Sequence, residues 1–215
     1  MNKDKDKKLE TKKLLYYCVI SVTFFIVIVI GYKFNLLSQT YNNLRPIFLE
    51  DGGDSCLQDL DRINIEYKRL GDIREGNCLV KNAVRIRDYP KTQLSGPITL
   101  SCHSAQDLAK FFDEIKAKNI RHLGSYNCRQ TRRYSVISEH GYGTAIDISE
   151  IDNASVQKDW NKNTKKGEII RNAHKSACNI FSNVITPDSN TNHRDHFHLD
   201  NGLGFGCLPN WLSLF

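Results

Sequence analysis

Two stretches in the second half of the chain repeat apolar residues with the period of an α-helix. Ser104 followed by Asp107 resembles a capping box, which predicts that the first helix begins near Ser104. Pro187 follows the expected end of the second helix. The apolar positions at helical spacing are Leu108, Phe111, Phe112 and Ile115 in the first stretch, and Ile169, Ile170, Ala173, Ala177, Ile180, Phe181 and Val184 in the second.

Short segments between and after these helices have the composition of β-strands. They lie at residues 83–89, 97–102, 144–149 and 196–200. The order mixes helices with strands that can pair in antiparallel fashion. We therefore predict an α+β fold with a small antiparallel sheet and flanking helices.

The first third of the chain has a different pattern. Residues 14–32 form a run of 19 uncharged, mostly apolar residues. A helix of this length spans about 28 Å of a hydrocarbon core of about 30 Å, so we predict one transmembrane helix. A cleaved signal peptide is the alternative, but the run is long for such a peptide and has no small-residue cleavage site after it.

The charges set the expected orientation of this anchor. Residues 1–13 carry six lysines and three acidic residues, and the whole chain has a net charge of +6. Lysine-rich flanks favour the cytoplasmic side, which places the tail 1–13 inside and the rest of the chain outside the inner membrane, in the periplasm. The nearly balanced remainder offers no concentrated basic face, which excludes a nucleic-acid partner.

The exported part divides into a linker and a domain. Residues 33–55 show no sustained period and contain Gly52 and Gly53, so we expect a tether there. Residues 56–215 are long enough to fold around one core.

Cysteine usage supports export. Cys18 lies in the expected membrane span, and the other six cysteines lie in the domain. An even number in an oxidising compartment predicts three disulfides, although sequence allows 15 connectivities. We expect Cys56 to pair with Cys78, because both border the same short N-terminal unit. The absence of any C-x-x-C spacing argues against a zinc ribbon.

Two of the expected strands carry candidate metal ligands. Alternation in residues 144–149 puts Asp147 on the face opposite to the apolar side chains, and two glycines follow His140 just before this strand. In residues 194–200, His196 and His198 share the face opposite to the apolar residues. Imidazole and carboxylate groups that meet on exposed sheet faces suit a divalent metal such as zinc. Either motif alone could instead be a solvated strand edge or a chance spacing.

The motifs SEHGYGTAIDIS and HRDHFHLD resemble the bacterial extensin-like C-terminal domain family. More distantly they are similar to zinc peptidases that include D-Ala-D-Ala carboxypeptidases, penicillin-insensitive murein endopeptidase and lysostaphin. The resemblance covers roughly Cys56 to Cys207, including GSYNCR at 124–129. It implies a small α+β zinc fold with His140, Asp147 and His198 as ligands of Zn²⁺.

The same resemblance indicates which residues are expected to be catalytic. His193, His196 and His198 reproduce the H-x-x-H-x-H spacing of the murein endopeptidase, whereas Asp195 stands where the carboxypeptidases have a glutamate. We favour His196 over Asp195 as the general base, because His196 shares the ligand face. Arg129 is expected either to stabilise an oxyanion or to be an ordinary surface arginine.

The remaining polar candidates are expected to have lesser roles. Ser138 is expected to form a hydrogen bond rather than to act as a nucleophile, since no G-x-S-x-G elbow is present. His122 and His174 are interpreted as surface or packing residues.

Together these features predict a single-pass inner-membrane protein with a periplasmic zinc peptidase domain. Its substrate is expected to be a peptidoglycan peptide, cleaved at a D-amino-acid linkage. The alternative is an inactive zinc-containing module that binds wall peptides or a protein partner.

Overall fold

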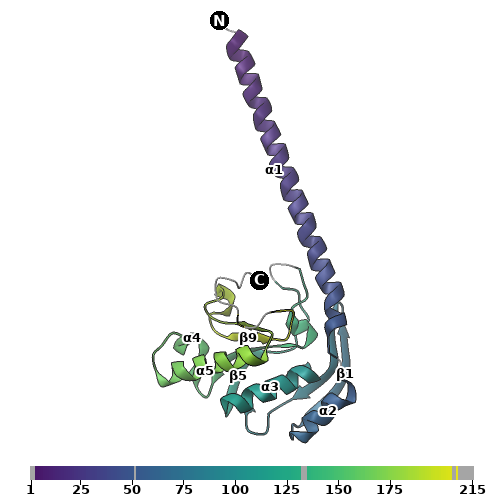
Figure 1. The fold of residues 1–215 in the computed structure, drawn as a ribbon, viewed down its shortest axis with the longest axis vertical. Coiled ribbons are helices and arrows are strands. Elements are labelled where there is room, and N and C mark those ends of the chain that lie inside the picture. The colour runs from purple at the N-terminus through teal and green to yellow at the C-terminus, as the bar shows by residue number, and fades with distance from the viewer. Residues whose placement is uncertain (1–2, 51, 132–134, 205–206, 208–215) are drawn as a thin grey trace.

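The computed structural model describes residues 3–50, 52–131, 135–204 and 207. A long helix projects from a folded body of strands and shorter helices (Figure 1). Residues 1–2 of the expected cytoplasmic tail and residues 208–215 of the expected domain lie outside this description.

Helix α1 (Lys3–Leu44) contains the apolar run. The segment Ser21–Phe48 is long and apolar enough to cross a membrane, by length and composition. Phe24, Phe25 and Val27 are exposed on it, as side chains that face lipid would be. One N-terminal helix that could span a membrane is thus present, as the sequence predicts.

The expected tether differs from the observed structure. Residues 33–44 continue α1, η1 follows at Arg45–Phe48, and α2 (Gly53–Arg62) begins three residues before Cys56, where the domain was expected to begin. A helix that is already nucleated needs no apolar period to extend, because each further residue adds one hydrogen bond. Pro46 then disfavours helical geometry at the residue before it, which explains why α1 ends here.

The described part of the body contains two sheets. The first has the order β1-β2-β4 and is antiparallel. The second has the order β3-β5-β6-β9-β8, with β7 paired to β6. Its strands pair in antiparallel fashion except for β3 with β5. The bounds are β1 (Tyr67–Glu75), β2 (Cys78–Ile86), β3 (Gln93–Leu94), β4 (Ile98–Ser101), β5 (Asn119–Gly124), β6 (Ala145–Ile151), β7 (Ala154–Ser155), β8 (Asn183–Ile185) and β9 (Phe197–Asp200).

The expected strands are found as parts of β2, β4, β6 and β9, and the α+β class is confirmed. Strand β1 was missed because most of its side chains are exposed, so its sequence lacks an apolar alternation. Strands β3 and β7 are only two residues long, and β8 only three. Such short strands carry too few positions to show a period.

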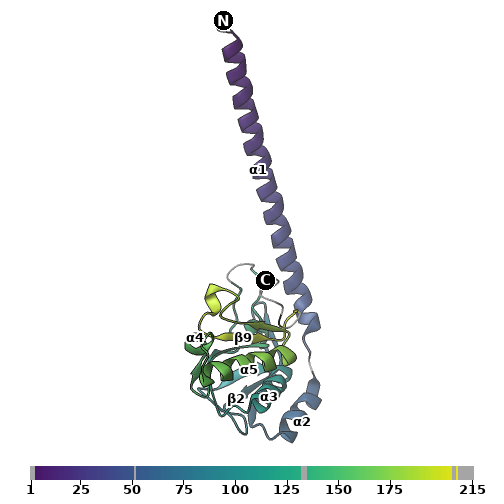
Figure 2. The ribbon, with the colours of Figure 1, turned by 60° about the vertical axis from the view of Figure 1, so that its left-hand side comes forward.

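Helices α3 (Cys102–Ile115) and α5 (Lys165–Ile180) lie side by side (Figure 2), and α4 (Val156–Asp159) precedes α5. Their apolar faces share one core with both sheets and α2. The cap of α3 is Ser101 rather than Ser104, since the Ser101 hydroxyl accepts a hydrogen bond from the Ser104 amide. Helix α5 ends before Phe181, and the expected helical residue Val184 lies in β8.

All six cysteines of the body form disulfides, as predicted, but the expected Cys56–Cys78 pair is wrong. The observed pairs are Cys56–Cys102, Cys78–Cys128 and Cys178–Cys207. Helix α2 packs against α3, which brings Cys56 to Cys102. Strand β1 carries the chain away from α2 before Cys78 begins β2. Short sequence separation therefore did not mean proximity.

Candidate metal centre

Two paired strands and one helical turn bring the three predicted ligands together. Antiparallel pairing of β6 with β9 places Asp147 directly opposite His198. His140 lies in η2 (Glu139–Tyr142), where the Ser138 hydroxyl accepts a hydrogen bond from the His140 amide. Gly143, with φ of +64°, then turns the chain into β6. Three segments far apart in sequence thus converge at one place.

The distances between the candidate ligand atoms fit a tetrahedral site. His140 Nε2 lies 3.2 Å from both His198 Nδ1 and Asp147 Oδ2, and His198 Nδ1 lies 2.8 Å from Asp147 Oδ1. Ligands held at about 2.0–2.2 Å in a tetrahedron are roughly 3.3 Å apart. The group His140, Asp147 and His198 could therefore hold a metal ion.

Hydrogen bonds on the far side of each imidazole aim its free lone pair at this point. His140 Nδ1 is 2.6 Å from the Ser125 carbonyl oxygen and must donate to it, which leaves Nε2 as an acceptor. His198 Nε2 is 2.9 Å from Asp200 Oδ2 and donates to that carboxylate, which leaves Nδ1 as an acceptor. Two lone pairs and a carboxylate then face one another, an arrangement that needs a cation or a proton between them.

The pKa shifts of Asp147 and His198 also indicate that a cation or a proton is needed between these groups. Burial alone would raise the pKa of Asp147, but hydrogen bonds from His140 and His198 hold it well below the usual range of a carboxyl group. Burial alone would lower the pKa of His198, but its hydrogen bonds to Asp147 and Asp200 raise it to about 10. Without a metal, a proton is thus bound strongly at this point.

The site is more enclosed than the sequence suggested. The alternation of β9 is as expected, with Phe197 and Leu199 in the core. The opposite face, however, is mostly covered, because the side chains of His140, Asp147 and His198 are only 3%, 17% and 10% exposed. Strand periodicity identifies the shared face, but it cannot show which loops cover that face.

His196 lies beside the three candidate ligands. Its Nε2 is 3.6 Å from Asp147 Oδ1, while its Nδ1 is 2.7 Å from Asp195 Oδ1. Asp195 precedes β9, and its side chain is 54% exposed. The His193 ring lies 5.0 Å from the His196 ring and 5.7 Å from the His198 ring, centroid to centroid. Desolvation and the neighbouring histidines lower the pKa of His193 to about 4.

The other residues singled out from the sequence, Arg129, His122 and His174, are not among the three candidate metal ligands. Arg129 is exposed, and its carbonyl accepts a hydrogen bond from the Ser138 amide. No hydrogen bond or ion pair joins its guanidinium to another residue that the structure describes. His122 Nε2 meets the Gly96 carbonyl at 2.9 Å. His174 lies 3.5 Å from the sulfurs of both Cys178 and Cys207, but these sulfurs are bonded to each other rather than available as thiolates.

Sequence reasoning missed two partners of the candidate ligands. Asp200 is 4% exposed and orients His198, and the alternation H-x-H-x-D along β9 already placed it on the ligand face. The Ser125 carbonyl orients His140, and no side-chain pattern signals a backbone acceptor.

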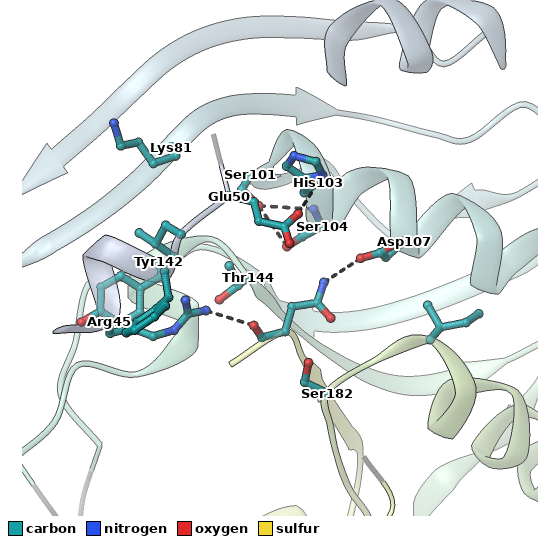
Figure 3. Close-up of a pocket in the computed structure, with 14 residues that line it drawn as sticks. Arg45, Glu50, Lys81, Ser101, His103, Ser104, Asp107, Tyr142, Thr144 and Ser182 are labelled. Carbon is teal, nitrogen blue, oxygen red and sulfur yellow. Dashed lines mark hydrogen bonds and ion pairs between the residues drawn. The ribbon is translucent and has the colours of Figure 1, made fainter. Parts of the chain in front are cut away.

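A pocket of about 200 Å³ lies elsewhere, between η1, η2 and the start of α3 (Figure 3). Its lining includes Arg45, Lys81, His103 and Tyr142, and none of the three candidate metal ligands. It is therefore separate from the convergent histidines.

The fold and the cluster define an α+β domain with a candidate metal centre on the β6–β9 pair. The chain belongs to the family described as extensin-like protein C-terminus, whose model matches residues 54–207. No curated protein and no solved structure matches the chain.

Proposed function

We propose that this protein is a zinc-dependent hydrolase that cleaves the peptides of peptidoglycan, related to the zinc peptidases that its motifs resemble. The observation that carries the proposal is the convergence of His140 Nε2, His198 Nδ1 and the Asp147 carboxylate, each within 3.2 Å of the others. Three protein ligands with an open fourth position are the usual arrangement of a catalytic zinc site.

The donor set suits zinc, and His140, Asp147 and His198 would hold it. When bound, zinc polarises a scissile carbonyl and acidifies a water molecule. His196 lies beside the ligands and is the group that would take a proton from the attacking water, with Asp195 holding its Nδ1 proton. Asp200 and the Ser125 carbonyl fix the tautomers of the two histidine ligands.

The location of the protein follows from its anchor. We infer that residues 14–32 cross the inner membrane, with the lysine-rich tail in the cytoplasm and the chain after residue 33 in the periplasm. The three disulfides are consistent with this oxidising compartment. Peptidoglycan, which lies in the same space, is then the available substrate, and D-amino-acid linkages are its distinctive bonds.

Digestion of purified murein tests the activity. The full chain in detergent micelles should release soluble muropeptides, chelation should stop the release, and added zinc should restore it. Chromatography and mass spectrometry of the products would identify the bond. A chain that binds cross-linked and uncross-linked wall peptides but cuts neither would replace the enzyme with a zinc-containing binding module.

Removing the carboxylate of Asp200 tests how the metal site is held. Asp200→Ala should weaken zinc binding by about 10-fold to 100-fold, because His198 loses the acceptor that fixes its ring and its tautomer. Competition with a chromophoric chelator measures this affinity. Asp188→Ala is a matched control, since Asp188 bonds to Trp160 rather than to a candidate ligand. Unchanged affinity in Asp200→Ala would contradict the assigned orientation of His198.

A further inference from the structure

A buried ion pair joins η1, the turn that follows the anchor helix, to the segment that carries a candidate metal ligand. Arg45 and Glu139 have side chains that are 3% and 9% exposed. The Arg45 guanidinium reaches both carboxylate oxygens, with Nη2 2.7 Å from Oε2 and Nε 2.9 Å from Oε1. Such two-pronged contacts fix geometry as well as charge. Glu139 immediately precedes His140, so this contact bears directly on the backbone that carries a candidate ligand.

The same guanidinium also reaches the second ligand-bearing segment. Arg45 Nη2 donates to the Asn201 carbonyl at 3.0 Å, a contact drawn in Figure 3. Asn201 follows Asp200, whose carboxylate orients His198. The Arg45 cation also lies over the Tyr142 ring, 5.4 Å from its centroid. One side chain from η1 therefore touches the chain beside His140 and the chain beyond β9.

The last turn of α1 adds further contacts to the same loop. The Tyr41 hydroxyl donates to Glu139 Oε1 at 2.6 Å. Asn42 accepts from the Ile137 amide at 2.8 Å and donates to the Ser135 carbonyl at 3.2 Å. The Glu139 carboxylate also accepts a hydrogen bond from the Thr144 hydroxyl, at 2.6 Å. Most of these partners come from the segment expected to be a tether.

We propose that Arg45, with Tyr41 and Asn42, positions the candidate metal site, so that the end of the membrane anchor is a working part of the exported domain. As far as it concerns a metal, this inference rests on the proposed function. Arg45 is a positioning residue: no hydrogen bond or ion pair joins it to a candidate ligand side chain, and it acts through Glu139 and Asn201. The matched family region begins at residue 54 and does not include these three residues.

Metal binding by the full chain in detergent micelles tests the proposal. Arg45→Met keeps much of the side-chain volume and removes the guanidinium. It should weaken zinc binding by about 10-fold to 100-fold, the usual loss when an outer partner of a ligand is removed. It should also alter the visible absorption of bound Co²⁺, which reports ligand geometry. Arg62→Met is the matched control, because Arg62 is exposed and pairs with Asp59 on α2.

Two milder variants guard against a general loss of folding. Arg45→Lys restores a charge but not the planar fork, so it should recover only part of the affinity. Tyr41→Phe removes one hydrogen bond to Glu139 and should shift affinity in the same direction by a smaller factor. Arg45→Met and Tyr41→Phe proteins with the parent's zinc affinity and Co²⁺ spectrum would overturn the proposal.

Hydrogen exchange of the metal-free protein separates this inference from the proposed function. The amides of Ile137, Gly141 and Thr144 lie in the segment that Arg45, Tyr41 and Asn42 contact. They are hydrogen-bonded within this segment or to α1. In Arg45→Met they should exchange at least about tenfold faster than in the parent. If the parent binds no zinc, the proposed function fails, and exchange decides the inference alone: equal rates in Arg45→Met and the parent would overturn it.

Discussion

His198→Ala should remove zinc from the purified protein and abolish hydrolysis of wall peptides. His198 contacts both other candidate ligands, Asp147 and His140, and also Asp200. Removing a direct ligand should cost more affinity than the roughly 10-fold to 100-fold that follows loss of an outer partner. Elemental analysis should find close to one equivalent of zinc in the parent and a small fraction of that in the variant.

The matched control for this result is His103→Ala. His103 lies in α3, and its Nδ1 is 3.3 Å from Glu50 Oε2, so it belongs to another part of the body. Its loss should leave zinc content and hydrolysis unchanged. Full zinc occupancy in His198→Ala would show that the metal is held elsewhere.

Two of the three candidate ligands, Asp147 and His198, were predictable because they obey strand alternation. Apolar Ile146 and Ile148, like Phe197 and Leu199, point to the core, which leaves Asp147 and His198 on the other face. The meeting of the two faces needed a further fact, that β6 and β9 are neighbours. The resemblance of the motifs implied that His140, Asp147 and His198 share one site, but it did not give the order of the strands.

Strand alternation could not predict that the site is mostly buried, nor that Arg45 contacts the segments around it. Arg45 lies in a segment without an apolar period, and its partner Glu139 is 94 residues away. The sequence alone does not distinguish a buried charged residue from an exposed one. The difference depends on tertiary contacts, which compensate the desolvation of the buried charge. The pairing of Cys56 with Cys102 was missed for a similar reason, since it depends on the packing of α2 against α3.

His196→Ala should spare the metal and remove the chemistry. His196 Nε2 lies 3.6 Å from Asp147 Oδ1, whereas the three candidate ligands lie within 3.2 Å of one another, so the ligand set remains complete without His196. Hydrolysis should fall by about 10² to 10⁴, the usual loss when a general acid or base is removed. Zinc content by elemental analysis and muropeptide release at saturating substrate should therefore change independently.

Asp195→Asn distinguishes the two candidates for the base. Asp195 is largely exposed and bonds to His196 Nδ1 at 2.7 Å, so it is placed to orient the imidazole rather than to reach the substrate. Its variant should keep zinc and lose less activity than His196→Ala. If Asp195 is instead the base, Asp195→Asn shows the larger loss while His196→Ala retains more. If both variants keep zinc and cut murein as fast as the parent, neither residue is the base, and proton transfer must be assigned to another group near the ligands, such as His193, whose ring lies beside those of His196 and His198.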